Sequence, residues 1–224
     1  MIVGSGLIAK SFSIFREDNN IIIFASGVSS SLCDDPFEFK REIDMLCGLN
    51  QNCRIIYFST ASLSDGSLES PYIRHKIEME RILMDRFKNY LILRLPTVVG
   101  SGGNSTNLFN HLINCISNDL SIKVNVNQYR SLIDADDLYT LTKGIILSDF
   151  LGIVDISLDN QSTVGEIVSD IESVLGINFR KELINSHQNH PISNQLLKDL
   201  IREDFYKIDR PDYNIRLIKK YQNK

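Results

Sequence analysis

The sequence predicts an α/β fold in which a doubly wound parallel sheet carries helices on both faces. Short apolar segments typical of strands alternate with helical segments through the first two-thirds of the chain, a pattern typical of parallel sheets. The first strand, 1–3, leads directly into a glycine-rich turn and a helix. We expect a core over residues 1–150. The C-terminal part, 151–224, should contribute one core strand and a helical region without forming an independent domain.

The expected elements follow from apolar spacing and from capping residues. The predicted strands are 1–3, 21–27, 54–58, 90–95, 121–127 and 153–158. The predicted helices are 10–16, 36–49, 71–87, 107–117, 138–147, 162–175 and 192–205. The basic tail, 216–224, is expected to be solvated.

Composition excludes several classes of protein. The chain has 224 residues, 43% of them hydrophobic, and a net charge of −4, which argues against a broad nucleic-acid surface. No apolar run approaches the ~20 residues that span a membrane. There is no secretory signal, so a cytoplasmic location is expected. The four cysteines lack metal-binding spacing, so no metal is expected. His187 and His190 are expected to be solvated.

The glycine-rich turn, Gly4-Ser5-Gly6-Leu7-Ile8-Ala9, follows the first strand. A strand, G-x-G-x-x-A and a helix form a dinucleotide-binding fingerprint, in which the glycines allow a tight turn and close approach of a pyrophosphate. The alternative is a turn of small residues without a ligand. The acid that usually ends the second strand of such a unit is absent here, because Glu17 and Asp18 precede the strand 21–27.

A tyrosine and a lysine share one face of the helix that Ser70 and Pro71 begin. Tyr72 and Lys76 are four residues apart, on a mostly apolar face where lysine is rare. A nearby cation lowers the pKa of a phenol, so the pair would make a general acid or base. The alternative is an amphipathic helix whose lysine reaches past a buried tyrosine to solvent.

A cluster of hydroxyl groups, Ser59-Thr60-Ala61-Ser62, ends the buried strand 54–58. Parallel α/β sheets place their binding sites at the carboxyl ends of strands. We therefore expect these hydroxyls to face a site.

Together these stretches resemble the extended short-chain dehydrogenase/reductase superfamily, within it the NAD-dependent epimerase/dehydratase group that acts on nucleotide sugars. The matching pieces occur in the family's order and cover roughly residues 1–147. They are Gly4–Ala9, Phe24–Gly27, Phe58–Thr60, Tyr72-x-x-x-Lys76, Leu93–Thr97, Asn107-Leu108 and Arg130–Asp137. The fold that the resemblance implies is a Rossmann-like sheet.

The resemblance implies a catalytic role for Tyr72, Lys76 and Thr60. Tyr72 would be the acid/base, Lys76 would bind the nicotinamide ribose and lower the tyrosine pKa, and Thr60 would hold the reacting sugar oxygen. The cofactor implied is NAD or NADP. Its expected contacts are Gly4, Gly6, Leu7, Ile8, Ala25, Ser26, Gly27, Ser59, Lys76 and Pro96.

Substrate contacts implied by the resemblance are Ser62, Thr97, Asn107 and Arg130, with the last two at the diphosphate of a nucleotide sugar. An arginine fork suits phosphate oxygens. The alternatives are a surface ion pair of Arg130 with Asp134 or Asp136, and a plain helix cap for Asn107. The family often forms dimers through the helix of its Tyr-x-x-x-Lys motif, which implies a homodimer through the Tyr72–Lys76 helix.

Two departures from the family are visible. About forty residues that would build the second and third strands and the adenosine pocket are absent between the first helix and the strand 21–27. The adenine would then lie exposed, or a partner subunit would cover it. In addition, Ala61 and Ser62 stand where dehydratases carry Asp-Glu, which argues against 4,6-dehydratase activity.

The function expected is that of an NAD(P)-dependent oxidoreductase of nucleotide sugars, of the reductase or epimerase type. The alternative from another class is a non-catalytic dinucleotide-binding sensor or scaffold, which the shortened fold favours. A reductase of a carbonyl compound other than a sugar is a third hypothesis.

Overall fold

Five parallel strands form the main sheet. The computed structural model describes residues 1–66, 69–103, 107–185 and 188–222. In this part of the chain all neighbouring strands of the sheet are parallel. Their order is β1 (Ile2–Val3), β2 (Ile21–Phe24), β3 (Arg54–Thr60), β4 (Tyr90–Leu95) and β9 (Gly152–Asp155). The predicted parallel α/β sheet is confirmed, and β1 lies at one edge of it.

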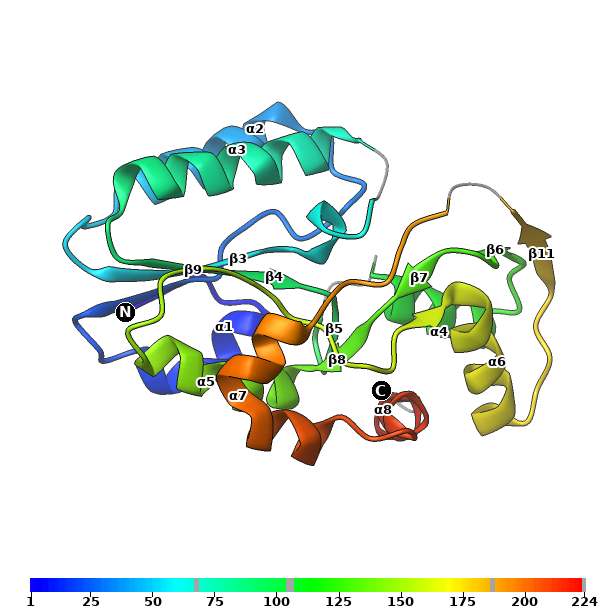
Figure 1. Ribbon diagram of the computed structural model, residues 1–224. Helices are drawn as coiled ribbons and strands as arrows, with labels where there is room; N and C mark the ends of the chain where they lie inside the picture. The colour runs from blue at the N-terminus through cyan, green and yellow to red at the C-terminus, as the bar shows by residue number, and fades with distance from the viewer. Residues whose placement is uncertain (67–68, 104–106, 186–187, 223–224) are drawn as a thin grey trace.

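Helices cover both faces of the sheet (Figure 1). On one face lie α2 (Pro36–Cys47) and α3 (Pro71–Arg86), which enclose an apolar cluster with β2, β3 and β4. On the other face lie α1 (Leu7–Ser11), α5 (Ala135–Leu147) and α7 (Gln195–Ile208). The sheet is therefore the middle layer of three, with an apolar core on each side.

The helix α3 forms as its sequence predicts. The Ser70 side chain accepts a hydrogen bond from the backbone N–H of Ile73 at 3.2 Å, and Pro71 occupies the first turn, where a helix has unpaired N–H groups. Both Tyr72 and Lys76 are buried, on the side of α3 that faces the sheet. Ion pairing anchors the helix further along, because Glu80 binds Arg94 of β4 at 2.7 Å.

A second region extends beyond the carboxyl ends of these strands (Figure 1). It contains three two-stranded pairs: β5 (Thr97–Val99) with β8 (Leu132–Asp134), β6 (Ile122–Asn125) with β11 (Lys181–Ile184), and β7 (Tyr129–Arg130) with β10 (Ser162–Thr163). Its helices are α4 (Leu108–Ser117), α6 (Val164–Leu175) and α8 (Tyr213–Tyr221). Since β9 pairs with β4, the C-terminal part contributes a strand to the core, and the boundary at residue 150 stays a prediction.

The C-terminal tail is where the sequence-based prediction was wrong. It was expected to be solvated, but α8 packs into the core through Leu217 and Ile218, which are 3% and 0% exposed. Lys220, from the basic face, pairs with Asp134 at 2.6 Å. The apolar residues recur at helical spacing within a basic segment. The prediction gave weight to the basic charge of the segment and missed the amphipathic helix.

The first helix also differs from its predicted bounds. It was expected over 10–16, but α1 is Leu7–Ser11 and a single 3-10 turn, Ser13–Phe15, follows. A second 3-10 turn, Ala61–Leu63, follows β3. The helix therefore begins directly at the glycine-rich turn.

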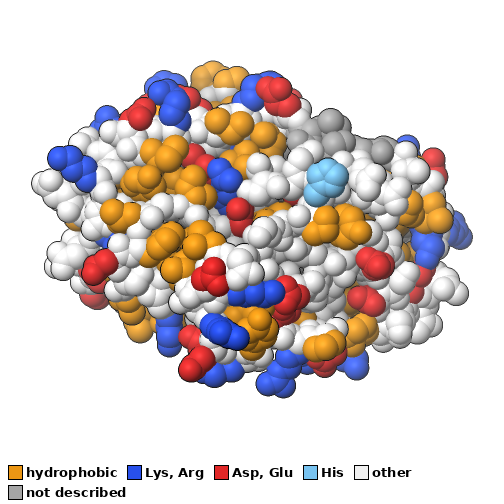
Figure 2. Space-filling model, in the orientation of Figure 1, with side chains coloured by type: hydrophobic (Ala, Val, Ile, Leu, Met, Phe, Trp, Pro, Cys, Tyr) orange, Lys and Arg blue, Asp and Glu red, His pale blue; other side chains and the backbone are white. Residues whose placement is uncertain are grey.

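The surface carries interspersed positive and negative side chains on the face shown in Figure 2. In the described ranges, none of the helices is both long and apolar enough to cross a membrane. The described residues also contain no cluster of histidine, cysteine and acidic side chains suited to a metal ion.

Candidate functional site

A cavity of about 670 Å³ opens at the carboxyl ends of β1 to β4. The structure brings every site residue predicted from the sequence to its wall. These residues are Gly4, Gly6, Leu7, Ile8, Ala25, Ser26, Gly27, Ser59, Thr60, Ser62, Tyr72, Lys76, Pro96, Thr97, Asn107 and Arg130. Their assembly is a result of the fold, and the role of each residue stays a prediction.

The glycine-rich turn forms one wall of the cavity. Gly4 has φ +123°, and a Cβ at this position would lie 2.4 Å from the backbone oxygen of Ala25, so only glycine fits. Gly6 differs, because its φ of −73° suits any residue and a Cβ there would meet no atom within 4 Å. The bare backbone of Gly6 therefore leaves room for a ligand and is not required for packing.

The opposite wall carries the proposed acid/base group. Tyr72 is 8% exposed, and its phenol lies near enough to Thr60 for that side chain to lower the phenol pKa. Thr60 ends β3, where its Oγ1 also accepts from the N–H of Ser62 at 3.3 Å. Helix and strand together place a phenol and a hydroxyl side by side at the cavity wall.

Lys76 does not act on Tyr72 as expected from the sequence. Its Nζ donates to Glu42 Oε1 at 2.9 Å and to the Tyr57 hydroxyl at 3.0 Å, and lies 5.8 Å from the ring centre of Tyr72. Burial raises the pKa of Tyr72 to about 12, although the Thr60 hydrogen bond opposes this rise. The pKa of Tyr72 is therefore raised and not lowered in this structure, first because the phenol is buried and also because the Glu42 carboxylate lies nearby.

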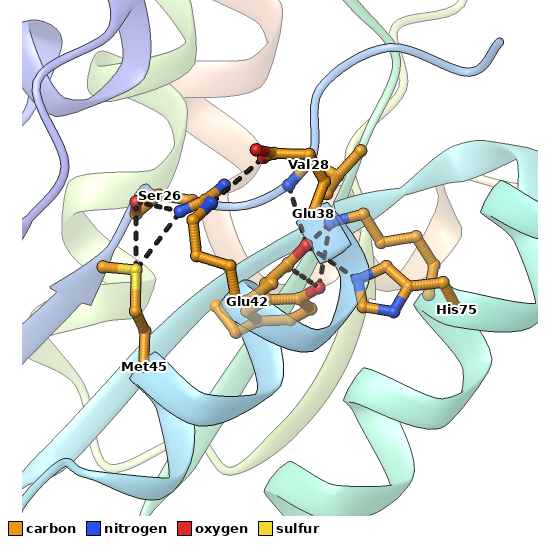
Figure 3. A network of polar contacts seen from close by, with 9 residues as sticks. Ser26, Val28, Glu38, Glu42, Met45 and His75 are labelled. Carbon is orange, nitrogen blue, oxygen red and sulfur yellow. Dashed lines mark hydrogen bonds and ion pairs between the residues drawn. The ribbon is translucent and has the colours of Figure 1, made fainter. Parts of the chain in front are cut away.

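Glu42 is the buried residue next to this site that the sequence analysis missed. Its side chain is fully buried on α2 and also accepts hydrogen bonds from the Val28 N–H at 2.7 Å and the Tyr57 hydroxyl at 2.8 Å (Figure 3). The ring nitrogen Nε2 of His75 lies 2.8 Å from the same carboxylate. A signal was available, since Glu42 precedes buried Leu46 by four residues and so shares the apolar face of α2.

The charges in this cluster stabilise one another. Burial alone would raise the pKa of Glu42, but the hydrogen bond with His75 and the charge of Lys76 bring it down to about 2. Burial lowers the pKa of Lys76, and the Glu42 carboxylate opposes that change. The two groups form a buried ion pair, of which Lys76 lines the cavity and Glu42 lies behind the wall.

Arg130 has a different partner from those expected. A nitrogen of its guanidinium lies 3.5 Å from a carboxylate oxygen of Asp65, which also accepts from the Asn189 side chain at 2.8 Å. The proposed pairing with Asp134 or Asp136 is wrong, because Lys220 binds those two carboxylates. Arg130 and its partner Asp65 both line the cavity, so this ion pair is part of the cavity wall.

Asn107 acts as a helix cap and also borders the cavity. Its Oδ1 accepts from the Asn110 N–H at 2.8 Å at the start of α4, and its Nδ2 donates to the Val98 carbonyl at 3.3 Å. The capping alternative is confirmed, and a role in binding substrate stays a prediction.

The C-terminal region contributes wall residues without a sequence signal. Gln161, His190 and Ile192 line the cavity, and Gln161 exchanges hydrogen bonds with the backbone of Ile192 at 2.7 Å in both directions. His190 is exposed, as expected, and is also one of these wall residues, while His187 lies outside the described residues. Only the tertiary fold brings this segment over the site.

Comparison with known proteins agrees with this architecture. A model of the NAD dependent epimerase/dehydratase family matches residues 52–147. No curated protein sequence matches the chain. The stretch 52–147 is thus similar to the NAD-dependent epimerase/dehydratase family, in agreement with the resemblance indicated by the motifs.

Solved structures share the fold over nearly the whole chain at low sequence identity. The UDP-glucuronic acid 4-epimerase from Bacillus cereus, in complex with UDP-glucuronic acid and NAD, aligns with a TM-score of 0.64 and 18% identity, over 96% of this chain and 79% of its own. The dTDP-glucose 4,6-dehydratase from Bacillus anthracis, in complex with NAD, gives 0.69 and 13%, over 99% and 80%. A dTDP-4-dehydrorhamnose reductase from Clostridium acetobutylicum gives 0.66 and 17%, over 97% and 85%.

Proposed function

We propose that the protein is an NAD(P)-dependent oxidoreductase of nucleotide sugars, of the reductase or epimerase type. The observation that carries this proposal is the meeting of Tyr72, Thr60 and Lys76 with the glycine-rich turn around one cavity. A non-catalytic protein would need the turn but no acid/base group. The family match and the nucleotide-sugar ligand in the Bacillus cereus structure support the same class.

The residues present fit a dinucleotide. The cavity has a volume within the usual range of cofactor and ligand sites, and Gly6 exposes backbone to it. The Ser59 hydroxyl is buried at the cavity wall and has no hydrogen-bond partner among the described residues. A ligand would satisfy that group, since buried polar atoms are rarely left unpaired. When bound, a nicotinamide dinucleotide supplies or accepts the hydride.

The protein's own groups would handle the proton. In the reducing direction, Tyr72 donates its phenolic proton to the carbonyl oxygen of the sugar, and in the oxidising direction its phenolate takes the proton of the hydroxyl. Thr60 hydrogen-bonds the same oxygen and keeps it beside the phenol. Lys76 borders the cavity, where one N–H can bind the ribose. Ala61 and Ser62 offer no acid/base pair for elimination of water, so we do not propose dehydratase activity.

Substrate would lie toward Arg130, Asn107, Thr97 and Ser62. Arg130 could bind diphosphate oxygens with two N–H groups while keeping its contact with Asp65. Its guanidinium is the cation at this end of the described cavity wall, so it is our candidate for recognition of the diphosphate.

Cofactor titration tests the proposal. Binding of NADH and of NADPH is followed by nicotinamide fluorescence, which is favourable because the chain has no tryptophan. We expect saturable binding of one of them, strengthened by UDP, GDP or dTDP. Absence of binding up to millimolar concentration would contradict the proposal.

One observation favours the second candidate, a dinucleotide-binding sensor or scaffold. Because β1 lies at the edge of the described sheet, next to β2 alone, we infer that the two strands that would build an adenosine pocket are missing. A weakened cofactor site would suit a sensor. Binding of NADH without turnover of any nucleotide sugar would support this function over the first.

We also infer a homodimer through α2 and α3. Three large apolar side chains remain exposed on these helices, Phe37 at 83%, Ile77 at 53% and Met84 at 41%, and such exposure is typical of interfaces. We expect light scattering to give twice the chain mass for the wild type and a monomer for Ile77→Asp. An unchanged mass in that variant would exclude this interface.

A further inference from the structure

The carboxylate of Glu42 joins four separate parts of the chain (Figure 3). Its contacts come from the Val28 loop, from Tyr57 on β3 and from His75 and Lys76 on α3, while Glu42 itself belongs to α2. All four hydrogen bonds measure between 2.7 and 2.9 Å. Four bonds satisfy both oxygens of a carboxylate, so its position is strongly determined.

This arrangement also determines the position of Lys76. The Lys76 side chain is 2% exposed, and its ammonium group donates to Glu42 and Tyr57 at 2.9 and 3.0 Å. The pair requires glycine at position 27, because a Cβ there would lie 2.7 Å from Glu42 Oε1 and 3.0 Å from Lys76 Nζ. Gly27, predicted to contact the cofactor, therefore has a packing requirement that involves no ligand.

Several charged and titratable groups act on the acid/base site. The charge of Glu42 raises the pKa of Tyr72. The charges of Glu42 and Glu80 raise the pKa of Lys76, and that of Arg41 lowers it. Tyr57 and His75 bind the Glu42 carboxylate. Glu80 is itself paired with Arg94 at 2.7 Å, and Arg41 with Glu38 at 3.0 Å. The ion pair between Glu42 and Lys76 thus reduces the electrostatic effect of the lysine charge on the phenol.

We propose that Glu42 is a positioning residue for the acid/base pair, which holds Lys76 against β3 and balances its charge, and which thereby adds to burial in keeping Tyr72 a protonated acid. This inference rests on the proposed function for its catalytic meaning. The resting site would then be prepared to give a proton to a carbonyl, which corresponds to the reducing direction. A bound cofactor would accept the remaining N–H of Lys76, while Glu42 and Tyr57 keep the other two.

A titration of position 72 tests the proposal in the protein without cofactor or substrate. A fluorinated tyrosine replaces Tyr72, and ¹⁹F NMR follows ionisation of that one phenol, which is more acidic than tyrosine and titrates where the chain remains folded. In Glu42→Gln we expect ionisation about one pH unit lower than in the otherwise wild-type chain, a tenfold change in the ionisation constant. The loss of a nearby negative charge gives this sign while Lys76 stays protonated, and the Lys76→Met background described below gives the effect of the Glu42 charge without that condition.

Tyr57→Phe is the matched control. It removes a buried hydrogen bond from the same carboxylate but leaves both charges in place. We expect no downward shift in this variant. An unchanged titration in Glu42→Gln, or an equal downward shift in Tyr57→Phe, would overturn the proposal.

Glu42→Gln leaves a buried lysine without its counter-ion and so risks unfolding. If it fails to fold, the comparison moves to Lys76→Met and the double variant Glu42→Gln, Lys76→Met. The label should ionise about one unit lower in the double variant, and equal values would overturn the proposal. Because no cofactor enters these titrations, failure of NADH binding would contradict the proposed function and leave this result standing.

Discussion

The two walls of the cavity are built in different ways. The α3 wall presents Tyr72 and Lys76 to the cavity, and behind it Glu42, Tyr57 and His75 form a buried network that holds Lys76. The β1 wall consists of a two-residue edge strand, a glycine turn and a helix of five residues. The difference teaches that the groups we propose for proton transfer are positioned by the folded core itself, whereas the turn offers bare backbone to the ligand that we propose.

Tyr72→Phe should have the largest effect of these variants, and it should change turnover through the α3 wall without changing the β1 wall. Without the phenolic hydroxyl we expect turnover to fall by about 1,000-fold, because general acid–base groups contribute on the order of 10²–10⁴. The Kd for NADH should stay within about twofold, since the ring is retained. Steady-state rates and fluorescence titration measure the two quantities, and wild-type-like rates would refute the role of Tyr72.

Lys76→Ala should lower the stability of the fold and should weaken both cofactor binding and turnover. It leaves Glu42 charged and buried, so we expect a loss of about 3–5 kcal/mol in the free energy of unfolding, measured with urea. Cofactor binding and turnover should both weaken. Lys40→Ala is the control, because the Lys40–Asp44 pair is exposed and should contribute little. A stability as high as that of the control would show that the Glu42–Lys76 pair is not formed.

Acid should weaken the α3 wall through Glu42. Its pKa is about 2 in the folded chain against 4.5 without the fold, so its stabilisation is complete above about pH 4.5 and is lost as pH falls toward 2. The difference corresponds to about 3 kcal/mol. Urea unfolding of the wild type and of Glu42→Gln across this range measures it. An equal acid dependence in both chains would argue against a low pKa for Glu42.

Gly6→Ala should have the smallest effect and should change the β1 wall alone. Its φ suits alanine and the added Cβ meets no atom of the protein, so the melting temperature should stay the same. The Kd for NADH should rise about tenfold, because the methyl group occupies the space of the ligand. Gly4→Ala is the contrast, since it clashes with Ala25 and should destabilise the fold itself. Unchanged affinity in Gly6→Ala would place the pyrophosphate elsewhere.

Local patterns predicted the helix α3 and the glycine turn well. Ser70, Pro71 and apolar spacing indicated the start and the buried face of α3, because capping and periodicity act within one or two turns of chain. Strand 21–27 was likewise visible as an apolar run, and it forms β2 at Ile21–Phe24. The partner of Arg130 was not predictable, because Asp65 lies 65 positions earlier in the chain and no spacing rule connects them.

The sequence by itself determined the parallel α/β architecture, the glycine turn and the helix that carries Tyr72 and Lys76. Hydrophobic periodicity, capping and glycine geometry are local properties, so they can be inferred from neighbouring residues. Only the tertiary structure decided that Glu42 neutralises Lys76, that α8 is buried and that His190 reaches the cavity. The physical reason is that the protonation of a buried group depends on burial and on charges a few ångströms away in space, wherever they stand in the chain.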